Sequence, residues 1–105
     1  MAFDTRCVAT PLRAVYADAA RILGDPLAER ALEACRRAGI EVVVLGPEEL
    51  AQELGLEVFI DPGQDEDAAI AAHMDTRGLA PEQTMRVADG EFYEAVVGEI
   101  MRRRG

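Results

Sequence analysis

Met85-Arg86-Val87-Ala88-Asp89-Gly90-Glu91-Phe92 joins a short apolar run to an acid, a glycine and a second acid, and an amphipathic segment follows at once. This order is typical of a buried strand that ends at the open edge of an α/β sheet and turns directly into a helix. Such a strand delivers the carboxylate of Asp89 to the edge where α/β proteins bind ligands. The stretch therefore indicates both a fold class and a place to look for chemistry.

The rest of the chain alternates strand-like and helix-like segments. Ile40–Leu45 is the clearest strand, because it is β-branched and almost continuously apolar. Three further strands are predicted at 2–8, 56–60 and 84–88. Helices are predicted at 12–23, from Pro26 to Ala38 with Asp25 as N-cap, from Gly46 to Gly55, from Asp65 to about Gly78, and after Glu91.

Strands that alternate with helices require right-handed crossovers and hence a parallel sheet. The predicted fold is therefore α/β: a small three-layer, Rossmann-like parallel sheet of about four strands in the order 3-2-1-4, with helices on both faces. The 105 residues suit one hydrophobic core, so residues 1–105 are expected to form a single domain.

Charge and composition exclude several function classes. The net charge of -9 disfavours long-range attraction to nucleic acid or to an anionic membrane, so a nucleic-acid partner would depend on local arginines such as Arg102–Arg104. All eleven basic residues are arginine, which excludes a lysine-containing phosphate loop and Schiff-base chemistry. Without an apolar stretch of membrane-spanning length, and with Cys7 and Cys35 expected as small buried residues, the chain is predicted to be cytoplasmic.

Acidic residues from separate segments are expected to meet at one edge of this sheet. Asp89 and Glu91 lie just past the last predicted strand, Asp4 lies in the first, and Asp67 opens a helix that begins on the same edge. Clustered carboxylates repel one another unless a cation or proton intervenes, so Mg²⁺ or Mn²⁺ is the expected ligand. The alternative is that these acids only cap helices and face solvent.

Three segments resemble the motifs of the PIN-like nuclease superfamily, NYN branch included. They are Phe3-Asp4-Thr5, Asp67-Ala68-Ala69-Ile70-Ala71-Ala72-His73-Met74 and Val87-Ala88-Asp89-Gly90-Glu91-Phe92. The resemblance implies a Mg²⁺- or Mn²⁺-dependent ribonuclease acting on single-stranded RNA. It implies as catalytic residues and metal ligands Asp4, Asp67, Asp89 and Glu91, with Glu53 as a further ligand. Arg6 departs from the family's pattern. Its positive charge beside the acids would reduce their need for a metal ion, so a second form of this hypothesis is a nuclease-like domain whose site is degenerate.

A second resemblance is to haloacid dehalogenase-like phosphatases. It covers Ala31–Leu56 and the segment Val87-Ala88-Asp89-Gly90, with Asp4 as the candidate nucleophile. Arg6 stands where that family has the second acid of Asp-x-Asp, Gly46 stands where it has Ser or Thr, and the family's lysine is absent. This resemblance therefore implies an inactive phosphatase-like domain.

A third hypothesis is a non-catalytic binding or regulatory module on the same scaffold, acting through a homodimer or a protein partner. His73, the single histidine, lies among alanines and is expected to pack rather than to bind metal. The sequence leaves open whether the chain is an enzyme, because fold alone does not determine function.

Overall fold

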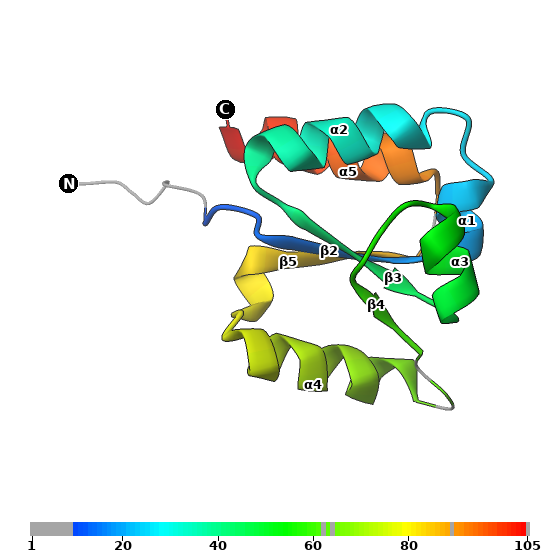
Figure 1. Cartoon of the computed structure of the whole chain (residues 1–105). Helices are drawn as coiled ribbons and strands as arrows, with labels where there is room; N and C mark the ends of the chain where they lie inside the picture. The colour runs from blue at the N-terminus through cyan, green and yellow to red at the C-terminus, as the bar shows by residue number, and fades with distance from the viewer. Residues whose placement is uncertain (1–9, 62, 64, 89, 105) are drawn as a thin grey trace.

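The computed structural model describes residues 10–61, 63, 65–88 and 90–104. Four strands form one sheet, with labels as in Figure 1. They are β2 (Ala14–Asp18), β3 (Glu41–Leu45), β4 (Phe59–Ile60) and β5 (Thr84–Val87). The strand order is β4-β3-β2-β5 and every neighbouring pair is parallel. The predicted parallel sheet of order 3-2-1-4 is thus confirmed.

Helices lie on both faces of the sheet and at its carboxyl edge (Figure 1). The helices are α1 (Ala19–Leu23), α2 (Ala28–Ala38), α3 (Glu48–Glu53), α4 (Glu66–Arg77) and α5 (Phe92–Arg104), with a 3-10 turn at Pro81–Gln83. Helices α2 and α5 pack together on one face and α4 covers the other. Helices α1 and α3 follow β2 and β3 directly, so they lie where the strands end.

The central strand β2 differs from the prediction, which placed a helix at 12–23. Residues Ala14–Ala17 are all buried, and Val15 and Tyr16 are residue types that favour strands. An apolar run that is buried on both faces has no clear period, so helical spacing can be read into it. The helix prediction is therefore wrong for residues 14–18 and holds only for the short α1. The strand predicted at 2–8 lies outside the described residues.

Two smaller differences concern element ends. The strand predicted at 56–60 is paired only at Phe59 and Ile60. Helix α2 begins at Ala28, with Leu27 as its N-cap, so Asp25 and Pro26 do not start this helix. The predictions for α4 hold well, because Asp65 caps the helix through a bond from Ala68 N at 3.0 Å and Gly78 ends it in a left-handed conformation.

The sheet separates two hydrophobic clusters. Alternate strand residues such as Val15, Val44 and Val87 face α2 and α5 and form the larger cluster with Phe92 and Val96. The smaller cluster lies under α4 and consists of Ala14, Tyr16, Val43, Leu45 and Ile70. The core is therefore concentrated on the α2–α5 side, and α4 has a much thinner apolar anchor.

Candidate functional site

The topological switch point of the sheet lies between β2 and β5. From β2 the chain crosses to β3 on one side, whereas β5 pairs with β2 on the other side. Ala17 is in register with Val87, so the two strands end side by side. Asp18, half-buried, is the last residue of β2 and hence the acid at the centre of the carboxyl edge.

Sequence reasoning missed Asp18 because it placed this residue within a helix. The signal was nevertheless present, since Ala14–Ala17 is an apolar run that stops at an acid, as the run before Asp89 does. Two such runs on neighbouring central strands are the sequence pattern that could have located the switch point.

Arg21 fixes the loop that follows β5. From α1, its Nη2 donates a hydrogen bond to the carbonyl oxygen of Ala88 at 2.7 Å, and its Nη1 donates to that of Gly90 at 2.5 Å. Its Nε is buried and has no hydrogen-bond partner within the described part of the chain. A guanidinium cation is thus held at the carboxyl edge, bonded to the backbone on both sides of position 89.

Asp25 ties the same region to the last helix. Its Oδ2 accepts a hydrogen bond from the backbone N–H of Tyr93 at 2.7 Å, and its Oδ1 accepts one from Leu27 N at 2.8 Å. Tyr93 lies in the first turn of α5, where a carboxylate satisfies a free N–H group and interacts with the positive end of the helix dipole. Asp25 therefore caps a helix that begins almost seventy residues later.

The predicted site acids within the described residues are not brought together. Asp67, in the first turn of α4, accepts a hydrogen bond from Arg86 Nη1 at 2.5 Å, and Glu66 pairs with the same guanidinium. Glu91 is exposed just before α5, and Glu53 is exposed at the end of α3. Asp4 and Asp89, as well as Arg6 and Cys7, lie outside the described residues.

The described acids do not by themselves form a metal-binding group, and with Asp4 and Asp89 outside the described residues the metal site stays a prediction. Among residues 10–61, 63, 65–88 and 90–104, no three His, Cys, Asp or Glu side chains are grouped as a metal site requires. Asp67 already has a cationic partner in Arg86, which removes the repulsion that would call for Mg²⁺. A site built from Asp67, Glu53 and Glu91 is thus not formed.

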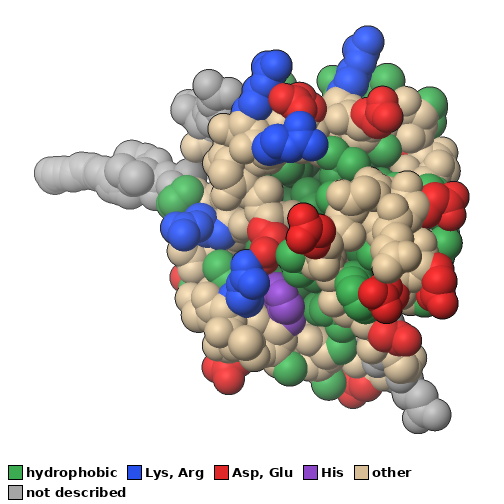
Figure 2. Space-filling view, viewed as in Figure 1, with side chains coloured by type: hydrophobic (Ala, Val, Ile, Leu, Met, Phe, Trp, Pro, Cys, Tyr) green, Lys and Arg blue, Asp and Glu red, His purple; other side chains and the backbone are tan. Residues whose placement is uncertain are grey.

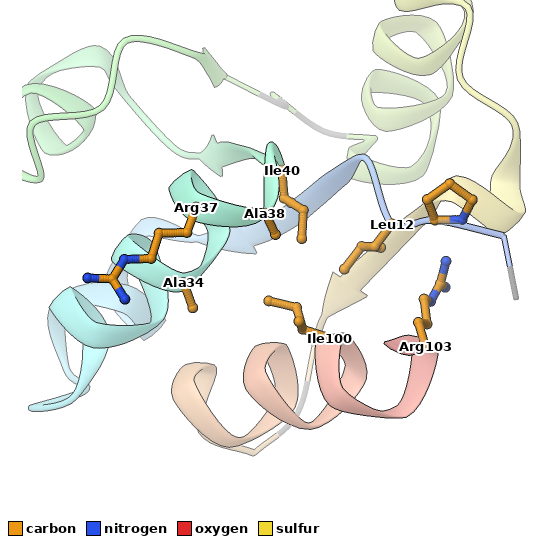
Figure 3. Close-up of a pocket in the computed structure, with 8 residues that line it drawn as sticks. Leu12, Ala34, Arg37, Ala38, Ile40, Ile100 and Arg103 are labelled. Carbon is orange, nitrogen blue, oxygen red and sulfur yellow. The ribbon is translucent and has the colours of Figure 1, made fainter. Parts of the chain in front are cut away.

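A groove of about 690 Å³ lies at the opposite, amino edge of the sheet, between the ends of α2 and α5 (Figure 3). Its apolar wall includes Leu12, Ile40 and Ile100. Arg37 and Arg103 come from its two sides, and each is engaged by a glutamate of its own helix, at 3.2 and 2.7 Å respectively. Arg103 also donates to the carbonyl oxygens of Thr10 and Glu82, so its role is to fasten the end of α5.

Comparison with family models, with curated proteins and with solved structures finds no match to this chain. Of the helices that the structure describes, none has both the length and the apolar character needed to cross a membrane. The geometry of the carboxyl edge is therefore the feature of this chain that bears on its function.

Proposed function

We propose that the protein is a non-catalytic binding or regulatory domain on a haloacid dehalogenase-like scaffold. The observation that carries this proposal is the position of Arg21, whose guanidinium bonds to the backbone on both sides of position 89. Through these two bonds a protein cation fastens the loop after β5 to α1, at the edge where α/β proteins bind ligands. The edge is thus held together by a protein side chain.

Asp18 takes the place that this resemblance first gave to Asp4. It ends the central strand and neighbours the end of β5, which leads to Asp89. In an active phosphatase of this type, a second acid stands two residues after the nucleophile, but here that position is Ala20. A phosphoryl transfer started by Asp18 would therefore lack its general acid.

A second catalytic group of the phosphatase family, a hydroxyl, is missing because position 46 is a glycine. It follows β3, where the family has a Ser or Thr hydroxyl. A Cβ atom at this position would lie 3.3 Å from the Cβ of Ala19, and the backbone φ of 154° is one that residues with side chains rarely adopt. Helix α1 thus packs in space that a hydroxyl-bearing residue would need, and the chain has no lysine to supply the family's other phosphate contact.

The test is hydrolysis of p-nitrophenyl phosphate and of single-stranded RNA in the presence of Mg²⁺ or Mn²⁺. The proposal predicts that the wild-type protein releases no more product than its Asp18→Asn variant on either substrate. Phosphate-ester hydrolysis that Asp18→Asn abolishes would contradict it and identify an active phosphatase. RNA cleavage that Asp67→Asn abolishes, and Asp18→Asn does not, would instead support the PIN-like nuclease hypothesis.

A further inference from the structure

Helix α4 is attached to the sheet by few apolar and several polar contacts. All of its residues are described, and Ile70 is the one that is buried; Met74 is partly buried and packs against the same cluster. Helix α5, in comparison, buries Phe92, Val96 and Ile100. Polar contacts therefore have a larger share in holding α4 than in holding the helices on the opposite face.

The innermost polar contact joins Tyr16 of β2 to His73 of α4. The Tyr16 hydroxyl lies 2.8 Å from His73 Nδ1, and the two rings meet edge to face with their centroids 5.5 Å apart. Tyr16 is only 1% exposed, so its hydroxyl proton needs an acceptor within the protein. Neutral His73 provides that acceptor at Nδ1 and carries its own proton on Nε2.

Two further charged groups face this histidine. Glu41 of β3 and Arg77 of α4 form an ion pair beside it. Burial is the main cause that lowers the pKa of His73, Glu41 acts to raise that pKa, and Arg77 acts to lower it. In Figure 2 the histidine, drawn purple, reaches the surface, so solvent protons have access to it.

We propose that protonation of His73 releases the C-terminal half of α4 from the sheet, so that this helix is an acid-sensitive cover over Ala14, Tyr16, Val43 and Leu45. A proton on Nδ1 removes the acceptor for the Tyr16 hydroxyl and places a charge in a half-buried position. At the first turn Arg86 holds both Glu66 and Asp67, whereas the last turn then keeps one ion pair, between Arg77 and Glu41, so the helix opens from that less firmly held end.

The direction of the pH effect follows from the two states of the helix. While α4 is docked on the sheet, burial holds the pKa of His73 below about 6.5, the pKa of the free side chain. Docking is therefore complete at a pH above the free pKa, and it weakens as the pH falls through the lowered pKa of the docked state. For each pH unit by which the pKa of the docked state lies below that of the released state, acidification makes the ratio of released to docked helix ten times larger.

The experiment combines two measurements on the full chain. An NMR titration follows the ring of His73, which is unambiguous because the chain has one histidine. Hydrogen exchange, corrected for the intrinsic pH dependence of amide exchange, compares residues 73–77 of α4 with helix α2 between about pH 8 and about pH 5. We expect protection in α4 to fall with the midpoint of the histidine titration while α2 stays protected.

His73→Asn is the matched variant, because its amide oxygen can accept from Tyr16 near the position of Nδ1 and does not titrate. It should keep α4 protected at both pH values. Tyr16→Phe removes the hydroxyl that needs an acceptor, so it should raise the pKa of His73. Protection of α4 that does not change relative to α2, or a pH dependence that persists in His73→Asn, would overturn the proposal.

Discussion

Replacement of Asp25 by alanine should weaken the carboxyl edge of the sheet. The carboxylate accepts hydrogen bonds from the backbone of Leu27 and of Tyr93, and it is the contact that joins the α1–α2 connection to the start of α5. The variant leaves the Tyr93 N–H in a partly buried place without its acceptor. We therefore expect a loss of global stability together with faster opening of the first turn of α5.

The magnitude follows from the kind of bond that is lost. A helix cap contributes about 1 kcal/mol, and a hydrogen bond to a charged group contributes about 1.5 to 3 kcal/mol. Because Asp25 is half-buried, the expected loss in the free energy of unfolding is about 1 to 3 kcal/mol. For a domain of this size, each kcal/mol lowers the Tm by roughly 4 to 8 °C.

Urea unfolding of wild type, Asp25→Ala, Asp25→Asn and Asp75→Ala measures this effect. Asp25→Asn keeps one acceptor oxygen and should lose about half as much stability as the alanine variant. Asp75→Ala is the matched control, since this exposed acid on α4 should change stability by no more than about 0.5 kcal/mol. A loss for Asp25→Ala no larger than that of Asp75→Ala would refute the role of Asp25 as a remote cap.

Two further predictions concern the core on the α2–α5 side. Burial raises the pKa of the Cys35 thiol to about 11, so iodoacetamide should not modify Cys35 in the folded protein but should modify it in urea. Peptide mass spectrometry detects the modification, and alkylation under native conditions would contradict this prediction. Phe92→Ala should lower the free energy of unfolding by about 3 to 5 kcal/mol because Phe92 is fully buried. Met101→Ala should change it little, since Met101 is 66% exposed. Equal losses for the two variants in urea unfolding would contradict this prediction.

Elements with local signals were predictable from the sequence. Asp65 and Gly78 mark the two ends of α4, and the β-branched run before Leu45 marks β3, because caps and strand formers act within a few residues. The strand β2 was missed because an apolar run that is buried on both faces carries no period. The acid that ends it, Asp18, was missed for the same reason.

The candidate site was harder to predict because its contacts join distant segments through the backbone. Arg21 binds carbonyl oxygens of Ala88 and Gly90, and any residue type supplies a carbonyl. The arginine expected beside the acids is Arg6, which lies outside the described residues, so that expectation stays a prediction. The contact that the structure does describe comes from Arg21, and only the three-dimensional position of α1 beside residues 88 and 90 identifies it.

Arg21 fastens the loop after β5 to α1 through two carbonyl oxygens, and the proposed function requires that this contact, and not a bound metal ion, holds the carboxyl edge. Thermal unfolding of wild type and Arg21→Gln, each with and without excess Mg²⁺, tests it most directly, since a ligand that binds only the folded state must raise its Tm. We predict that Mg²⁺ leaves the Tm of the wild type unchanged and that Arg21→Gln lowers it. A wild-type Tm that climbs with the Mg²⁺ concentration, and no longer does so in Asp89→Asn, would contradict the claim.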